Sequence, residues 1–407
     1  MTGVTIDHLV ATTAFIAAIL VFTGLFTQTL QAAILYQQNR HVALKASDLL
    51  DSTLLSPGWP YNWGETNTTL SCFGLQKPGA SGYVLSSFAL MRLTSLSGVP
   101  VEYPRDSGVW YNNISSGPSG YLFIPMSDSI TYETASRLLG VNGTYGFQLS
   151  ITPLVAVSIS ENRSDPLRLK IEASGPGFPI AGASLTYYLY RAYKTGSYPS
   201  LELLTGSAQT DSAGAAFLDF GFDGADETYT IVVYARLSGL QGLGQYSHRT
   251  FTRGAGVIPF VVDYEEGKVY LAHSWDVQDQ GTPVPDYKFN ATFFILTGNL
   301  GFQEWAIANS TGSLNYGSKN YEVTTLPVGY SGFLLVTYLN AGEYGMSIMP
   351  WGIGTLAVST SFGENPAGNV WTATDLRQAT VDVLAYQAKI TCWSSQGYQI
   401  LSHRGWW

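Results

Sequence analysis

The pattern of apolar and polar positions divides the chain into two unlike parts. Residues 9–26 form an apolar run of eighteen residues that contains no charge and no proline. A helix rises about 1.5 Å per residue, so this run spans about 27 Å, close to the roughly 30 Å hydrocarbon core of a bilayer. The pattern therefore predicts an N-terminal helix that is long enough to cross a membrane.

The same helix is predicted to continue to about residue 55, where a Ser-Pro-Gly sequence ends it. Beyond the apolar run, an apolar stripe recurs at helical spacing: Leu35, Val42, Ala46 and Leu49. A single membrane span needs about 20 apolar residues and no particular pattern afterwards. The stripe therefore indicates that the second half of the helix packs either against its own β-rich part or against neighbouring helices.

After residue 56 the chain changes to the period of β-strands, with turn residues between the runs. We expect a mixed transitional region over 56–160, with short helices over 84–94 and 131–139, the second capped by Asp128 or Ser129. From Tyr145 the alternation predicts a strand that continues through Val155 and Ile159. A β-sandwich is expected over 161–254 and a second β-rich domain over 255–407, in which Glu265 and Glu266 form a charged hairpin turn.

Within 161–254, Pro179 and Gly182, then Asp211 and Gly214, and finally the strand that begins at Tyr229 form an ordered series of turns and strands. This order resembles immunoglobulin- or transthyretin-like modules, which are common on cell surfaces. The predicted fold class is therefore α+β: a long N-terminal hydrophobic and amphipathic helix over 1–55, followed by mostly-β immunoglobulin-like sandwich domains.

Composition narrows the classes of function. Charged residues are only 12% of the 407, the net charge is −9, and there are 26 tyrosines and 10 tryptophans. The negative charge and the absence of a Lys/Arg cluster argue against a nucleic-acid partner. Low charge with many aromatic and hydroxyl residues favours a surface that packs against copies of itself or works outside the cell.

The sequence contains no catalytic motif, so we expect no enzyme activity and no cofactor. The five histidines are isolated and have no metal-ligand spacing: His8, His41, His248, His273 and His403. Four acidic residues in one short segment could offer oxygen ligands to Ca²⁺, although a solvated acidic loop is the more ordinary interpretation: Asp219, Asp223, Asp226 and Glu227. A Gly-x-x-Gly-x-Gly sequence from Gly239 follows a strand but opens no helix, so it is not a nucleotide-binding fingerprint.

Two further sets of residues bear on whether the protein is exported from the cell. Six Asn-x-Ser/Thr sequons lie after the helix and predict N-linked glycans on an extracellular protein: Asn67, Asn113, Asn142, Asn162, Asn290 and Asn309. The chain has two cysteines, Cys72 and Cys392. In a secreted protein they can form a disulfide that ties the region after the helix to the last strand; otherwise they are buried free thiols.

The start of the chain lacks the basic segment and small-residue cleavage site of a standard signal peptide. A long helix, apolar and then amphipathic, followed by a β-rich region resembles type IV pilin-like subunits, and archaeal ones in particular. The resemblance covers the first 55 residues. It implies a helix that sits in the membrane before assembly and then packs into the core of a filament. Asp7, beside His8, either neutralises the amino group of a neighbouring subunit or is a first-turn acid without a partner.

Two functions follow from these patterns. The first is a structural subunit of an extracellular pilus-like filament, whose N-terminal helices bundle in the core and whose β-domains form the outer surface. Its partner is then itself, as a helical homopolymer, with the membrane as its surroundings before assembly. The alternative is a membrane-anchored adhesin or envelope-binding protein at the cell surface, for which the helix is an anchor with a helical stalk.

Overall fold

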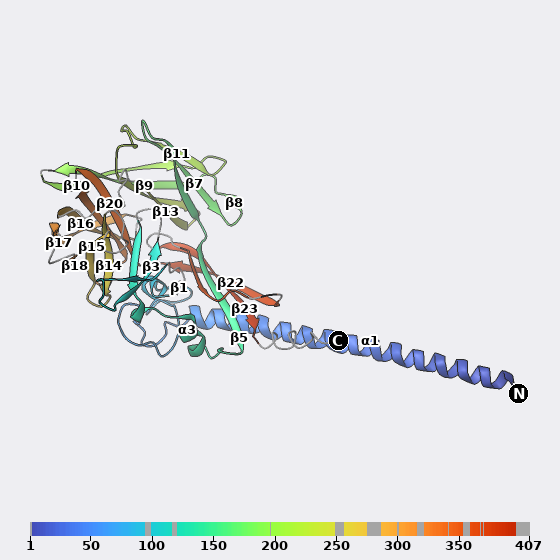
Figure 1. Ribbon diagram of the computed structural model, residues 1–407. Coiled ribbons are helices and arrows are strands. Elements are labelled where there is room, and N and C mark those ends of the chain that lie inside the picture. Colours follow the sequence, from blue (N-terminus) through green and yellow to red (C-terminus); the bar gives the residue numbers. More distant parts are fainter. Residues whose placement is uncertain are drawn as a thin grey trace.

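The computed structural model describes residues 2–93, 99–115, 120–195, 197–248, 256–274, 286–298, 301–315, 321–340, 342–352, 359–366, 368 and 370–395. One long helix precedes a large globular part made mostly of β-sheets, which confirms the predicted α+β class. The predicted helix is confirmed as α1 (Thr2–Leu54). It projects from the globular part as a rod with the N-terminus at its free end (Figure 1).

The end of α1 follows the predicted stop signal. The amide of Leu55 donates the last helical hydrogen bond to Asp51 O, and Gly58 then adopts φ +79°, a left-handed conformation that glycine takes at little cost. A Cβ at Gly58 would also collide with the carbonyl oxygen of Cys72. The chain therefore turns away from the helix at the position that the Ser-Pro-Gly sequence predicts.

The two short helices of the transitional region differ from their predicted bounds. The first is only α2 (Ser87–Met91), capped by Ser86 and preceded by the short strand β1 (Val84–Leu85). The second is α3 (Tyr132–Leu138), with Thr131 as its N-cap rather than Asp128 or Ser129. The Thr131 side chain accepts a hydrogen bond from the amide of Thr134, whereas Asp128 ends a separate 3₁₀ turn, η1 (Met126–Asp128).

A five-stranded sheet packs against the end of α1, and its strands come from both ends of the chain. Its order is β1, β22 (Thr372–Val381), β23 (Leu384–Ser394), β5 (Tyr145–Pro153) and β21 (Thr360–Gly363). The strand β5 pairs on one side with β23 and on the other with β21. The predicted regions 56–160 and 255–407 therefore both contribute strands to this one sheet.

The central sandwich is inserted in the chain directly after β5, and the strands of two further sheets follow it before β21. It contains β6 (Ala156–Arg163), β7 (Arg168–Gly175), β8 (Phe178–Pro179), β9 (Ser184–Thr195), β10 (Tyr198–Gln209), β11 (Ala215–Asp219), β12 (Tyr229–Leu237) and β13 (Leu240–His248). The order is β10-β9-β12-β13-β6-β7-β11, with β8 paired to β7. Side chains of β7 and β11 share one core with those of β9 and β12, so the strands form two facing layers.

One sequence interpretation in this region needs correction, and another is confirmed. The alternation from Tyr145 is not one strand: β5 ends at Pro153, and β6 begins at Ala156 in a different sheet. The glycine-rich sequence after β12 opens no helix, as expected, and forms β13. A Cβ at Gly242 or Gly244 would collide with backbone oxygens of β6, so these glycines permit the close approach of the two strands.

Two further sheets complete the globular part. A six-stranded sheet has the order β18 (Tyr321–Thr325), β15 (Lys268–His273), β14 (Val257–Asp263), β4 (Tyr121–Pro125), β3 (Trp110–Ser115) and β2 (Val101–Glu102). A four-stranded sheet has the order β17 (Phe302–Asn315), β16 (Asp286–Leu296), β19 (Gly332–Asn340) and β20 (Glu343–Trp351). The predicted charged turn at Glu265 and Glu266 is confirmed as the connection between β14 and β15.

One core joins the sheets around α1 to the inserted sandwich. The outer face of the sandwich places Tyr190 against Phe294 and Phe333, with ring centroids 4.6 and 5.8 Å apart. The buried residues of α1, of the five-stranded sheet and of the β16–β19 pair belong to the same apolar cluster. The sandwich is therefore packed onto the rest of the globular part rather than connected to it by linkers alone.

Candidate functional site

The candidate functional site is the part of α1 that the globular part leaves uncovered. Every side chain from residue 6 to residue 38 is exposed. Many of them are large and apolar, which is unusual for a surface in water: Ile6, Leu9, Val10, Phe15, Ile16, Ile19, Leu20, Val21, Phe22, Leu25, Phe26, Leu30, Ile34, Leu35 and Tyr36. An apolar surface of this length requires a non-aqueous surrounding, either lipid or protein.

The hydroxyl groups in this region are compatible with such a surrounding. Thr12 Oγ1 donates to His8 O and Thr13 Oγ1 donates to Leu9 O, both at 2.8 Å, and Thr27 and Thr29 make the same bond one turn back. Each of these hydroxyl groups therefore donates its proton within the helix. This bond removes much of the free-energy cost of placing the hydroxyl group in lipid. Among the residues that the structure describes, α1 is the helix long and apolar enough to span a membrane.

The globular part covers only the last turns of α1. Val42, Ala46 and Leu49 are buried, as the apolar stripe predicts, together with Leu50 and Leu54. These side chains pack beneath β22 and β23. Leu35 lies seven residues before Val42 and so on the same face, yet it is 58% exposed. The stripe therefore continues beyond the surface that its own chain covers.

A polar cluster fixes the angle at which α1 leaves the sheet. Arg377 of β22 donates from Nε to Asp51 Oδ1 and from Nη2 to Asp51 Oδ2, both at 3.0 Å. It also donates to Asp375 Oδ1 at 2.8 Å and to Ser47 Oγ at 3.1 Å, and Tyr83 donates to Asp51 at 2.9 Å. This bidentate geometry holds two turns of α1 against one strand. Local sequence patterns do not reveal this cluster, because Arg377 is more than 300 residues away from Ser47 and Asp51.

The contacts within this cluster shift the pKa values of Arg377 and Asp375. Hydrogen bonds to Asp51, Asp375 and Tyr83 raise the pKa of the Arg377 guanidinium. Burial alone would raise the pKa of the Asp375 carboxyl, but hydrogen bonds from Arg377 and Ser47 hold it below its usual value. Both charges are therefore present across the physiological range of pH.

The predicted sequons lie in different surroundings. Asn67, Asn142 and Asn162 are exposed, and Asn67 Nδ2 donates to Asp263 Oδ1 at 3.2 Å. Asn113 and Asn290 are half-buried in strands β3 and β16. Asn309 lies in β17, and its side chain is outside the described residues. Three of the six sequons thus offer an accessible side chain.

The predicted disulfide between Cys72 and Cys392 is not formed, and both cysteines are free thiols. Cys72 is exposed where the chain leaves α1, whereas Cys392 is buried in β23 in the core beneath α1. Burial raises the pKa of the Cys392 thiol to about 11, which keeps it protonated and unreactive at neutral pH.

The acidic residues considered for Ca²⁺ point to separate partners. Asp219 pairs with Arg168 at 3.5 Å, Glu227 pairs with Arg191, and Asp223 Oδ1 accepts from the amide of Ala225. In the described part of the chain, no three His, Cys, Asp or Glu side chains converge as metal ligands. His8 is exposed on α1 beside Asp7, and His403 lies outside the described residues.

Comparisons with known proteins assign no family to this chain. No family model matches the chain, and no curated protein matches it. Among solved structures, the D0-D1 domain of intimin aligns over 52% of this chain and 98% of its own, at 14% identity and a TM-score of 0.22. Trypsin-activated alpha-2-macroglobulin from Escherichia coli aligns over 66% of this chain and 20% of its own, at 11% identity and a TM-score of 0.22.

A chimeric titin Z1Z2-Z1Z2 tandem aligns over 48% of this chain and 90% of its own, at 13% identity and a TM-score of 0.16. TM-scores this low carry no argument about fold or function. Any inference about the class of protein therefore depends on the geometry described above. That geometry is an apolar helical rod attached to a globular part made of several β-sheets. The resemblance of α1 to pilin helices stays a prediction.

Proposed function

We propose that the protein is the structural subunit of an extracellular pilus-like filament, in which the exposed helices bundle into a core and the β-sheets form the outer surface. The proposal rests on one observation. Apolar side chains of α1 remain exposed beyond the first 20 residues after Ile6, in the stretch that precedes the docked end of the helix. A bilayer accounts for about 20 apolar residues. Leu30, Ile34, Leu35 and Tyr36 lie beyond that length and are 47, 55, 58 and 72% exposed.

In the proposed filament, neighbouring helices cover this surface. The first part of α1 lies in lipid before assembly and in the dry core afterwards, so it exchanges one apolar surrounding for another. Small residues such as Gly24, whose Cβ position meets no other atom, allow neighbouring helices to approach closely. Charged residues are only 12% of the chain, so few charges have to be desolvated where identical subunits pack together.

A charge placed on the uncovered stripe tests this proposal. Leu35→Glu leaves residues 9–26 unchanged, so insertion into a membrane is expected to continue, but a carboxylate in the helical bundle prevents packing. Gln37→Glu adds the same charge two residues away, on the opposite side of the helix, and is the matched control. Detergent is removed from the purified full-length chain and its variants, and the products are imaged by negative stain.

Fibres from the unaltered chain and from Gln37→Glu, but not from Leu35→Glu, are the expected result. If the unaltered chain gives only single particles or membrane-inserted monomers, the filament proposal is wrong. Equal behaviour of the two variants would also count against it, because a simple stalk does not distinguish the two faces of the helix.

A second candidate, a membrane-anchored surface adhesin, is favoured by one observation. The chain packs its sheets around the last turns of α1 without help from another subunit. A single helix and a self-contained body are sufficient for an anchored binding protein. Flotation of the full-length chain with liposomes, without fibres after removal of detergent, is the outcome that this candidate predicts.

A further inference from the structure

A pocket on the inserted sandwich lies apart from α1 and from the surfaces considered above. Its volume is about 540 Å³, within the range of small-molecule sites, which is about 300–1,000 Å³. It is lined by Gly182, Ser184, Thr186, Tyr188, Tyr234, Arg236, Leu237 and Ser238. In Figure 1 the sandwich strands β7, β9 and β11 lie at the end of the globular part away from the α1 rod.

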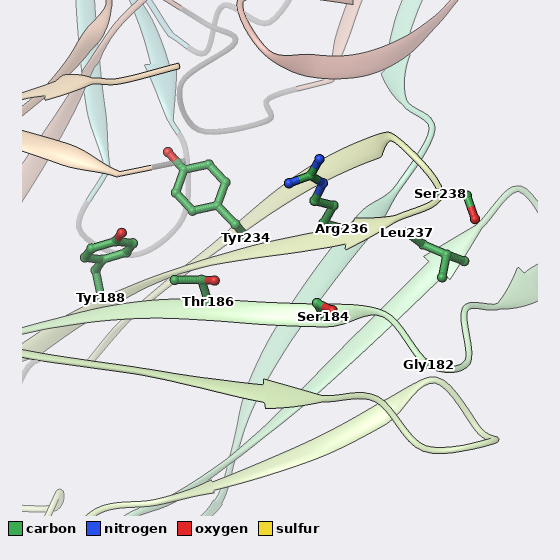
Figure 2. Close-up of a pocket in the computed structure, with 8 residues that line it drawn as sticks. All are labelled: Gly182, Ser184, Thr186, Tyr188, Tyr234, Arg236, Leu237 and Ser238. Atoms are coloured by element: carbon green, nitrogen blue, oxygen red, sulfur yellow. The ribbon is translucent and has the colours of Figure 1, made fainter. Parts of the chain in front are cut away.

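The strand register explains why these side chains share one surface. Ser184, Thr186 and Tyr188 alternate along β9 and so project from the same face. On the neighbouring strand β12, Arg236 is opposite Ser184 and Tyr234 is opposite Thr186. Figure 2 shows the rings of Tyr188 and Tyr234 and the guanidinium of Arg236 on the same side of the two strands.

This polar face is the outer side of a layer whose other side forms the sandwich core. The residues between those of the pocket, such as Leu185 and Val233, are buried in that core. Phe302 of β17 covers one end of the outer face and packs edge-on against Tyr188, with ring centroids 5.2 Å apart. The face is therefore closed by aromatic rings at one end and open at the end that carries Ser184 and Arg236.

The pocket carries a positive charge that no described residue neutralises. Arg236 is exposed and makes no ion pair or side-chain hydrogen bond within the described residues, and no acidic side chain lines the pocket. Gln241 of β13 is opposite Arg236, and its Oε1 atom is buried without a hydrogen-bond partner. The Oη atom of Tyr234, at the closed end, is also buried and has none.

We propose that this pocket binds an acidic carbohydrate. Hydroxyl groups of serine, threonine and tyrosine can each donate and accept hydrogen bonds, which matches the many hydroxyls of a sugar ring. The half-buried ring of Tyr188 supplies an apolar surface for the C–H face of the sugar. The guanidinium of Arg236 binds one carboxylate or sulfate with two parallel hydrogen bonds. A neutral sugar would leave this cation without a partner.

Binding of acidic sugars to the full-length chain in detergent tests the proposal. The probes are sialyllactose, digalacturonic acid and a chondroitin sulfate disaccharide, with lactose as the neutral comparison and sodium sulfate as the free anion. Saturable binding of at least one acidic sugar, at least tenfold tighter than that of lactose, is expected from isothermal titration. Binding of none of the three acidic sugars would overturn the proposal.

Variants locate the binding in the pocket. Arg236→Gln is expected to remove the tenfold preference for the acidic sugar, and Ser184→Trp is expected to abolish binding because the indole fills the open end. Arg137→Gln, an equally exposed arginine on α3, is the matched control and is expected to bind normally. Circular dichroism establishes that each variant is folded.

Two outcomes would count against the site. If Ser184→Trp is folded and binds as the unaltered chain does, the sugar binds elsewhere. If sodium sulfate alone matches the affinity of the acidic sugar, the pocket holds an anion and does not recognise a carbohydrate. None of these measurements depends on fibre formation, so they are independent of the proposed filament.

Discussion

At the scale of single residues, Asp382 carries a buried carboxyl group beside Ser331 and Ser87. It lies in the turn between β22 and β23 and adopts φ +53°. Its Oδ1 atom accepts a hydrogen bond from Ser331 Oγ at 3.1 Å, while Oδ2 is buried without a partner. Burial raises the pKa of the Asp382 carboxyl, although hydrogen bonds from Ser331 and Ser87 act in the opposite direction.

The raised pKa predicts a stability that falls as the pH rises. The folded state keeps the proton to a higher pH than the unfolded state, whose carboxyl has a pKa of about 3.9. The contribution of Asp382 to the free energy of unfolding is therefore most favourable below about pH 3.9, and it is lost as the pH rises through the pKa of the folded state. Asp382→Asn removes the buried charge, and asparagine tolerates positive φ. We expect the variant to be more stable at pH 7 by about 1 kcal/mol.

Thermal unfolding at pH 7 and at pH 3.5 measures this effect. The variant should unfold at a higher temperature than the unaltered chain at pH 7, and the two should nearly coincide at pH 3.5. A lower unfolding temperature for Asp382→Asn at pH 7 would mean that the carboxylate stabilises the turn.

At the scale of elements, the attachment of α1 depends on one arginine that binds two turns of the helix. Lysine cannot reproduce the two parallel hydrogen bonds that Arg377 makes to Asp51. The ion pair is partly exposed to solvent, which limits its contribution. We therefore expect Arg377→Lys to weaken the contact between α1 and β22 by about 1 kcal/mol.

Amide hydrogen exchange over residues 42–54 reports this local loss directly. Exchange should be faster in Arg377→Lys than in the unaltered chain, while the amides of the distant strands β7 and β11 should not change. Arg163→Lys, which alters a surface pair with Asp219 at 3.9 Å, is the control. Equal protection of residues 42–54 in all three proteins would show that apolar burial alone holds the helix.

The elements that the sequence predicted best are those with a long, uninterrupted pattern. The helix was predicted to within a residue or two, since no proline or glycine breaks its second half before Pro57. The local pattern did not identify the strand β10. It is a sheet edge on which half- and fully exposed residues alternate, so few apolar residues mark it.

At the scale of the whole molecule, accessibility decides which sequons can carry a glycan. Asn67, Asn142 and Asn162 are exposed, so we expect each to be modified when the chain is exported by a cell that attaches N-linked glycans. Asn290 lies in β16 between two neighbouring strands, and Thr292 of the same sequon is buried, so we expect it to be unmodified.

Mass spectrometry of glycopeptides from the native source tests this expectation. A glycan on Asn290 together with unmodified exposed sequons would contradict the strand pairing of β16. The absence of glycans from all sites would place the chain in a cell or compartment without N-linked glycosylation, and the predicted glycoprotein would be wrong.

The layout of the sheets could not be predicted from local patterns. The alternation at Phe147 and Leu149 looks the same as that at Val157 and Ile159, yet the first pair belongs to the sheet beneath α1 and the second to the inserted sandwich. Period-2 patterns identify a strand but not its partner. For the same reason the arginine that holds α1 and the pocket between β9 and β12 were found only in three dimensions.

The arrangement of the five-stranded sheet also has a consequence for the order of synthesis. The surface on which α1 docks consists largely of β22 and β23, which end at Ser394, whereas α1 ends at Leu54 and is translated long before them. Until β22 and β23 have been translated, the stripe from Val42 to Leu54 lacks the strands that cover it. If α1 inserts into a membrane, we therefore expect insertion to precede the docking of α1 onto its own sheet.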